Sequence, residues 1–283
     1  MMDICLYHPT MVIFLDDSER YLSRIAIELD ENLPYLTASA PQSVLAYIKN
    51  HSKYDKFTEI DYSNIYSFER FNQVSVLVVD YDMPGTGMDG FTFSQEIKKL
   101  SKELKIHTPK IILLTGQASE AVAIDGFNKG YIDRYISKND PSYGKKLNGI
   151  IQELQILYFA ESSENLLNKL ASKAFFPLKD ENFLEILLKI SQENNIVERY
   201  TVNNSGDLLL LNKDGEPFWL IIISPDDIKY GNKQNYMKNA NEIKNELGVY
   251  YYNLTKETDL IPIDRNKICS LKHYLHHVWP PNI

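Results

Sequence analysis

Acidic side chains stand directly after two apolar runs of the sequence. Asp16 and Asp17 follow Met11–Leu15, and Asp80 follows Val74–Val79. Short runs of branched apolar residues are typical of strands that a sheet buries on both faces. In an open parallel sheet, ligands bind beyond the carboxyl ends of the strands, where the strand order reverses. We therefore expect the three carboxylates to converge if these two strands are neighbours.

Carboxylates gathered in this way repel one another, and this repulsion favours a bound divalent cation. Mg²⁺ suits such a site, because it binds a few carboxylate oxygens and keeps several of its waters. An aspartate beside the ion could also accept a phosphoryl group, since its carboxylate can form an acyl phosphate. The sequence therefore predicts Mg²⁺ as the cofactor and phosphoryl transfer as the chemistry.

Two further polar side chains follow the next predicted strands. Thr115 stands after Lys110–Leu114, and Lys138 comes just after Ile132–Ile136. A hydroxyl and an ammonium group at the same edge of the sheet could both contact a phosphoryl oxygen. Each also has a simpler interpretation, in which Thr115 is a turn residue and Lys138 is a solvated surface lysine.

The elements that would position these groups alternate between strand and helix along the first half of the chain. The predicted strands are 11–15, 36–40, 74–79, 110–114 and 132–136, and the predicted helices are 18–32, 41–50, 91–104, 119–129 and 141–174. Five such β/α units predict an α/β fold, with a parallel five-stranded sheet and helices on both faces.

Five short motifs of this half occur in the order and spacing of a known family. They are LDDS at 15–18, DYDMP at 80–84, MDG at 88–90, LLTG at 113–116 and YISK at 135–138. With these motifs, residues of about 10–160 resemble the receiver domain of two-component response regulators. The resemblance implies a flavodoxin-like (βα)5 fold and a sensor histidine kinase or phosphotransfer protein as the partner.

The resemblance also implies a role for each residue that matches the motifs. Asp80 would be the phosphoacceptor, and Tyr135 would be the aromatic switch that turns inward on activation. Thr115 and Lys138 would contact the phosphoryl group. The ligands of Mg²⁺ would be Asp16, Asp17, Asp80 and the backbone carbonyl of Asp82.

The sequence departs from the family in three places. Lys138 is followed by Asn139-Asp140-Pro141 instead of directly by proline, so the lysine could be aimed differently. The loop after Pro84 is about two residues longer than usual. Residues 51–72 form an insertion rich in Tyr and Phe, which we interpret as a long loop that packs on the sheet of this domain.

The second half of the chain has a different pattern and predicts a smaller α+β domain with an antiparallel sheet. Its predicted helices are 180–192 and 235–247, and its predicted strands are 196–202, 207–211, 218–224 and 249–253. Asp214-Gly215 between two apolar runs indicates a hairpin. We expect a receiver domain at 1–160 and a second domain at 161–283, with the boundary near Glu161–Ala174.

Composition argues against several classes of function. The net charge of the chain is −8 and its pI is about 5.3, so attraction to DNA or an anionic membrane is not expected. Residues 161–283 carry 14 Lys and Arg against 17 Asp and Glu, unlike a basic DNA-binding domain. No apolar run approaches the ~20 residues of a membrane span. Two cysteines and an N-terminus without a signal-peptide pattern favour the cytoplasm.

Two features of the second half leave alternatives open. Cys269, His273, His276 and His277 could bind a soft divalent metal if they share a helix face. We favour the simpler interpretation, in which this C-terminal segment docks on its own domain. The apolar spacing from Leu147 to Leu157 fits either a short homodimer seam or packing on the sheet, followed by a linker.

The function predicted from the sequence is that of a phosphorylation switch without an enzymatic activity of its own. Phosphorylation of Asp80 would change the contacts of a second domain that does not bind DNA. Two alternatives are a receiver-regulated enzyme with a catalytic second domain and an adaptor that works without phosphorylation.

Overall fold

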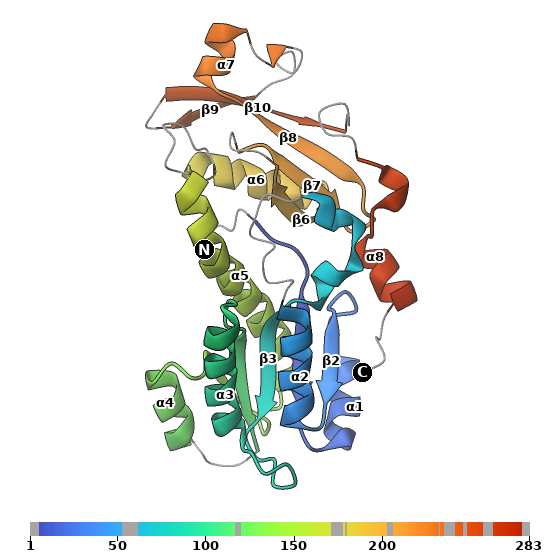
Figure 1. The fold of residues 1–283 in the computed structure, drawn as a ribbon, viewed down its shortest axis with the longest axis vertical. Coiled ribbons are helices and arrows are strands. Elements are labelled where there is room, and N and C mark those ends of the chain that lie inside the picture. The colour runs from blue at the N-terminus through green and yellow to red at the C-terminus, as the bar shows by residue number, and fades with distance from the viewer. Residues whose placement is uncertain are drawn as a thin grey trace. The chain divides into compact units, whose positions relative to one another are not determined.

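The computed structural model divides the chain into two compact units, each with a five-stranded sheet among its described residues (Figure 1). The structure describes residues 6–52, 62–116, 120–170, 178, 180–202, 206–231, 233–234, 241–245, 248–256 and 263–278. The first unit, here the parallel unit, comprises Thr10–Lys56, Glu69–Tyr158 and Val278–Ile283. The second unit, here the antiparallel unit, comprises Met1–Pro9, Phe57–Phe68 and Phe159–His277.

The sheet of the parallel unit has the order β2-β1-β3-β4-β5, and all its strand pairs are parallel. The strands are β1 Met11–Leu15, β2 Tyr35–Ala38, β3 Val74–Asp80, β4 Lys110–Thr115 and β5 Arg134–Ser137. Every residue of β1, β3 and β4 is buried, as their continuous apolar runs predict. The flavodoxin-like fold expected from the sequence is confirmed.

Helices cover both faces of this sheet. They are α1 Glu19–Glu28, α2 Pro41–His51, α3 Gly90–Leu104, α4 Glu120–Asn128 and α5 Tyr143–Leu170. Helices α1 and α5 form one core cluster with the strands, through residues such as Ile25, Leu147 and Leu154. Helices α2 and α3 contact each other in front of the sheet (Figure 1). Neither α5 nor any other helix among the described residues is long and apolar enough to cross a membrane.

The sheet of the antiparallel unit has the order β6-β7-β8-β10-β9. The strands are β6 Ile196–Thr201, β7 Leu208–Asn212, β8 Pro217–Ile223, β9 Asn241–Asn245 and β10 Gly248–Thr255. Helix α6, Glu181–Glu193, packs Phe183, Leu187 and Ile190 on one face of β7 and β8. The other face carries a second cluster around Trp219. Because both faces are covered, β7 and β8 are apolar at almost every position instead of alternating.

The insertion is divided between the two units, so the expectation that it packs on the parallel sheet is wrong for its described residues 62–68, which belong to the antiparallel unit. Its two 3-10 helices are Tyr62–Tyr66 and Phe68–Asn72. Ile65 is fully buried in the cluster around Trp219, and its carbonyl accepts a hydrogen bond from the backbone of Cys269 at 2.9 Å. The chain therefore leaves the parallel unit after α2, completes a core in the antiparallel unit and returns for β3.

Two elements of the antiparallel unit differ from the prediction. The helix expected at 235–247 is a strand, β9, over its described residues Asn241–Asn245, because that segment pairs with β10. Cross-strand pairing outweighs a weak helical propensity here. A short helix, α7 Pro225–Tyr230, was missed although Ser224 and Asp227 form a capping box at its start.

Candidate functional site

The three carboxylates meet at the carboxyl edge of the parallel sheet. Asp16 and Asp17 directly follow β1, Asp80 is the last residue of β3, and the two strands are paired. One oxygen atom from each carboxylate lies within 4.8 Å of those of the other two. Strand β1 lies between β2 and β3, so the strand order reverses here. An all-oxygen set at this spacing fits a hard cation such as Mg²⁺.

The start of α1 holds the first of these carboxylates in place. Asp16 is almost fully buried, and its Oδ1 accepts a hydrogen bond from the backbone N–H of Ser18 at 2.9 Å. Ser18 is the N-cap of α1, and its hydroxyl accepts from the N–H of Tyr21. Asp17 is half-buried. The positive end of the helix therefore lies beside the acidic cluster and offsets part of its charge.

The loop after β3 positions the third carboxylate. Asp82 is exposed, and Asp89 is the N-cap of α3, where its carboxylate accepts from the N–H of Thr92 at 2.6 Å. Gly90 starts α3 so close to Asp80 that an added Cβ would lie 2.2 Å from the Asp80 carbonyl oxygen. Only glycine permits this approach, and it sets where α3 begins relative to Asp80.

Lys138, the residue directly after β5, reaches the acidic cluster with its ammonium group. Its Nζ lies 2.9 Å from Oδ1 of Asp80 and also donates to Oδ2 of Asp16. Its side chain is only 18% exposed. The missing Lys-Pro sequence therefore does not aim the lysine away from the site.

The surroundings of Asp80 raise its pKa to about 6 from an ordinary 3.8. Burial is the largest cause, because it disfavours the charged carboxylate, and the Asp16 charge acts in the same direction. The hydrogen bond and charge of Lys138 oppose this shift. The Asp80 carboxylate is thus an anion at neutral pH that is poorly solvated, which suits a nucleophile.

The two other predicted residues lie on the neighbouring strands. Thr115 ends β4 and is buried, one residue beyond the partner of Asp80 in the paired strand. Tyr135 lies on β5 and is 37% exposed. The structure therefore places Thr115 at the carboxyl edge with the carboxylates, whereas the Tyr135 ring is partly open to solvent.

Side-chain hydrogen bonds shape the turn after β5 in place of a proline that directly follows Lys138. The Asn139 side-chain amide donates to the carbonyl of Gly116, and the Lys138 N–H donates to the carbonyl of Thr115 at 2.8 Å. Asp140 accepts from the N–H of Ser142 just before α5. These bonds tie the loops after β4 and β5 together and fix the backbone of Lys138.

One residue of the site was not identified from the sequence. The Tyr21 ring lies under the Lys138 ammonium group, with Nζ 4.2 Å from the ring centroid. In the sequence, Tyr21 lies in the predicted helix 18–32 and shares the apolar spacing of Ile25 and Leu29, which indicates no more than packing. One signal was available: Tyr21 lies in the first turn of the helix that follows Asp16 and Asp17, and this places it near the acidic cluster.

The alternative Cys-His metal site is not assembled in the described residues. The Cys269 thiol donates to the carbonyl of Tyr66 at 3.1 Å, and the His273 ring packs against Phe68. The side chain of His277 lies outside the described residues. The acidic cluster is the one group of three metal-ligating side chains among those described. Leu271 and Tyr274 of the same segment are buried, in agreement with a docked C-terminal segment.

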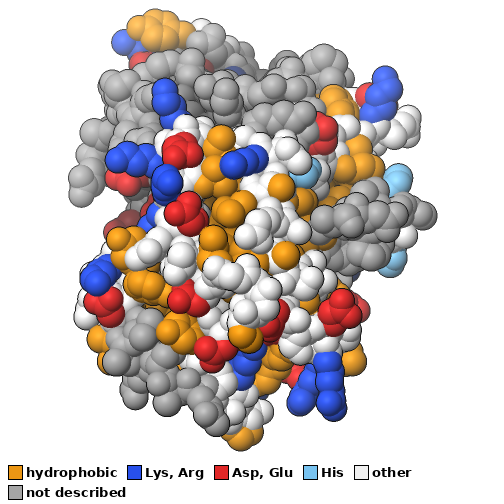
Figure 2. Space-filling view, turned by 60° about the horizontal axis from the view of Figure 1, so that its bottom comes forward, with side chains coloured by type: hydrophobic (Ala, Val, Ile, Leu, Met, Phe, Trp, Pro, Cys, Tyr) orange, Lys and Arg blue, Asp and Glu red, His pale blue; other side chains and the backbone are white. Residues whose placement is uncertain are grey.

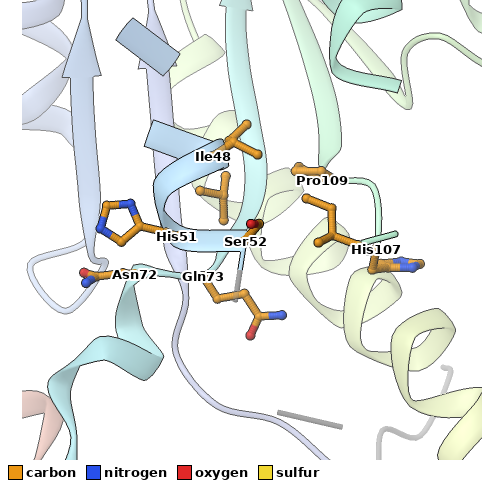
Figure 3. A pocket seen from close by; sticks show the side chains of 9 residues that line it. Ile48, His51, Ser52, Asn72, Gln73, His107 and Pro109 are labelled. Atoms are coloured by element: carbon orange, nitrogen blue, oxygen red, sulfur yellow. The ribbon is translucent and has the colours of Figure 1, made fainter. Parts of the chain in front are cut away.

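A small pocket lies at the opposite edge of the parallel sheet, near the start of β3 and β4 (Figure 3). Its lining residues are Ile48, His51, Ser52, Asn72, Gln73, Val74, Ile106, His107 and Pro109. Its cavity volume of about 20 Å³ has room for about one water and is far below the ~300 Å³ at which small-molecule sites usually begin. We assign no ligand to it.

Figure 2 tilts the carboxyl edge of the parallel sheet toward the viewer. Acidic and basic side chains are interspersed there among hydrophobic and uncharged ones. Salt screens the interaction between exposed charges that lie more than about 10 Å apart at 0.1 M ionic strength. The field at Asp80 is therefore set mainly by its near neighbours, Lys138 and Asp16.

Part of the chain matches a known protein family. Residues 38–143 match the family described as the response regulator receiver domain. This range contains Asp80, Thr115 and Lys138 but begins after Asp16 and Asp17. No curated protein matches the chain.

One solved structure resembles nearly the whole chain. The Legionella pneumophila response regulator LqsR is 30% identical, with a TM-score of 0.79 over 97% of this chain and 96% of that chain. The receiver domain of NtrX from Brucella abortus is 19% identical, with a TM-score of 0.38 over 51% of this chain and 97% of that chain.

Proposed function

Because this chain belongs to the response regulators, we propose that it accepts a phosphoryl group on Asp80 from a histidine kinase or phosphotransfer protein. The observation that carries the proposal is the convergence of three carboxylates and the Lys138 ammonium group at one edge of the parallel sheet. A strand-end aspartate that served only as a cap would need none of these partners.

In the proposed reaction, an oxygen of the Asp80 carboxylate attacks the phosphorus of a phosphohistidine. The new O–P bond makes an acyl phosphate as the N–P bond breaks, and the imidazole nitrogen keeps that electron pair. Lys138 would move from the carboxylates to a phosphoryl oxygen, and the Thr115 hydroxyl would donate to another. The poorly solvated Asp80 carboxylate is an anion at pH 7, so no general base is needed.

The acidic cluster supports Mg²⁺ as the cofactor. We propose that Asp16, Asp17, Asp80 and the backbone carbonyl of Asp82 hold it. When bound, Mg²⁺ would neutralise charge on the phosphoryl oxygens. Burial is the largest cause of the raised pKa of Asp80, and the charge of the buried Asp16 adds to it; a cation there would relieve this added repulsion.

The switch would run from Asp80 through Thr115 to Tyr135 on the neighbouring strand β5. The acyl phosphate would attract the Thr115 hydroxyl, and Tyr135 would turn inward from its partly exposed position. We propose that this change alters contacts of the antiparallel unit and not DNA binding, since residues 161–283 are mildly acidic. The proposal assigns no reaction to that unit.

Phosphorylation of the full chain by a small phosphodonor tests the proposal. We expect acetyl phosphate with Mg²⁺ to add one acid-labile phosphoryl group, which intact-protein mass spectrometry detects. Asp80→Asn should remove the signal, whereas the matched variant Asp82→Asn should keep it because Asp82 is exposed and offers only its backbone. Labelling of Asp80→Asn, or no labelling of the wild type by acetyl phosphate or any phosphorylated kinase, would contradict the proposal.

A further inference from the structure

Tyr21 contacts the same Lys138 ammonium group that contacts the acidic cluster. Its ring centroid lies 4.2 Å from Nζ of Lys138, which also contacts Asp16 and Asp80. A second aromatic ring, Tyr143, lies against Tyr21 with centroids 6.5 Å apart and planes at 27°. The ammonium group therefore contacts two carboxylates and the face of a tyrosine whose ring stacks on a residue of α5.

The environment makes this contact stronger than one on an open surface. The Lys138 side chain is only 18% exposed, and a cation above an aromatic ring gains more when water is excluded. The Tyr21 hydroxyl is buried and interacts with the Tyr143 side chain of α5. The ring face of Tyr21, and not its hydroxyl, is the part that contacts the Lys138 ammonium group.

Lysine needs such a support in this protein. Its side chain has four rotatable bonds, and hydrogen bonds of Lys138 and Asn139 fix only the backbone of the turn. When a phosphoryl group arrives, the ammonium group must leave the carboxylates of Asp16 and Asp80. Without a second contact it would be free to move into solvent at that step.

We propose that Tyr21 is a positioning residue for the phosphoryl-binding lysine. Its ring face keeps the Lys138 ammonium group at the acidic cluster while the contacts to carboxylate oxygens are exchanged for contacts to phosphoryl oxygens. The inference rests on the proposed function and adds to it a specific residue of α1. The competing explanation is that Tyr21 only packs, because it also lies against the core cluster of this unit.

A double-mutant cycle separates these explanations. The variants are Tyr21→Phe and Tyr21→Leu, each in the wild type and in Lys138→Ala. The measured quantity is the affinity of the full chain for beryllofluoride with Mg²⁺, followed by calorimetry, with the melting temperature recorded for each variant. Phenylalanine keeps the ring face, whereas leucine keeps only an apolar side chain.

We expect Tyr21→Phe to bind within about twofold of the wild type and Tyr21→Leu to bind about tenfold more weakly, as a contact of this kind predicts. In the Lys138→Ala background, Tyr21→Leu should cause no further loss. Equal losses in both backgrounds, wild-type affinity of Tyr21→Leu, or an equal loss in Tyr21→Phe would overturn the proposal.

A second measurement needs no phosphoryl mimic and so keeps this inference separate from the proposed function. The Hε protons of Lys138 above an aromatic face should have NMR signals shifted upfield. The shift should persist in Tyr21→Phe and vanish in Tyr21→Leu. An unchanged signal in Tyr21→Leu would contradict the role of Tyr21, whereas failure of the wild type to bind beryllofluoride would contradict only the proposed function.

Discussion

The two units each contain a five-stranded sheet among their described residues, yet their cores are closed in different ways. In the parallel unit, the helices that cover the sheet alternate with its strands along the chain. In the antiparallel unit, one face is covered by α6, but the other is completed by Ile65 from the insertion and by Ile263. Tyr7 also pairs with Arg199 at the edge strand β6.

This difference explains which predictions succeeded. The sequence shows directly which residues form a helix or strand when the packing partner is the next element along the chain. It does not show that an aromatic loop inserted between α2 and β3 supplies a core residue to another sheet. The antiparallel unit therefore depends on contacts of long sequence separation, and the experiments below test that dependence.

The largest expected effect is the loss of folding when the antiparallel unit is separated from the rest of the chain. A fragment of residues 161–283 lacks Ile65 and Tyr7, so its sheet would expose one apolar face and one edge. We expect it to be unfolded or aggregated, as measured by circular dichroism and NMR dispersion. A matched fragment of residues 10–160 should fold, since it contains the whole core cluster of the parallel unit. A well-dispersed spectrum for 161–283 would disprove the dependence.

A single substitution tests the same point within the intact chain. Ile65→Ala removes a fully buried side chain, and we expect it to lower the free energy of unfolding of the antiparallel unit by about 2–5 kcal/mol. The control Ile27→Ala should change it by less than about 0.5 kcal/mol, because Ile27 is 85% exposed. Denaturant unfolding measures both. Beryllofluoride affinity should stay unchanged in Ile65→Ala, and an equal loss of stability in both variants would count against the assignment.

In the parallel unit, the buried Asp80 carboxylate of the site lowers the stability of the folded state at neutral pH. Burial raises the pKa of Asp80 from 3.8 to about 6, so the folded state favours the protonated form. The stability that this proton gives is present below pH 4 and is lost as the pH rises through 6. Asp80→Asn imitates the protonated form, so without Mg²⁺ it should be more stable than the wild type at pH 7.5 by up to about 3 kcal/mol.

This advantage of Asp80→Asn should shrink as the pH falls from 6 toward 4. Denaturant unfolding at several pH values in the presence of a chelator measures it. The matched Asp82→Asn, at an exposed carboxylate, should differ from the wild type by less than about 0.5 kcal/mol. A pH-independent difference for Asp80→Asn would argue against a raised pKa.

The smallest expected effect concerns the backbone beside Asp80. In Gly90→Ala, the new Cβ would lie 2.2 Å from the Asp80 carbonyl oxygen, so α3 or β3 must shift. We expect a loss of about 1–3 kcal/mol in the free energy of unfolding and weaker beryllofluoride binding. Gly85→Ala in the same loop has no neighbour within 4 Å and should have little effect on either quantity. If the two variants behave alike, the close approach does not constrain the site.

Much of the site could be predicted because its chemistry lies at the ends of strands. An apolar run that ends in aspartate indicates both the strand and the edge at which its side chain lies. The same reasoning could not find Tyr21. The apolar spacing of a helix shows which residues face the core, but it does not show that Tyr21 contacts Lys138, which lies 117 residues later in the chain. The turn Asn139–Pro141 indicated a different aim for Lys138, yet hydrogen bonds from side chains take the place of the proline.

In the antiparallel unit, the local sequence indicates secondary structure correctly at some positions, whereas pairing between strands overrides it at others. The capping box at Ser224 was a sufficient signal for α7. For Asn241–Asn245, the residues alone favour a helix, and only the neighbouring strand β10 explains why they are extended. The hairpin at Asp214-Gly215 was correct, because Gly215 has a φ of +82° that its turn requires.

The path of the chain through the two units also restricts how this protein can be inherited or rebuilt. Signalling proteins commonly gain new outputs when one genetic crossover joins a sensor module to an unrelated module. Here a crossover near Tyr158 would carry away only part of the antiparallel unit, because Phe57–Phe68 and Met1–Pro9 would stay behind. Neither product of such a crossover would contain a complete antiparallel unit. We therefore expect the two units to be inherited together, and an engineered version to need both.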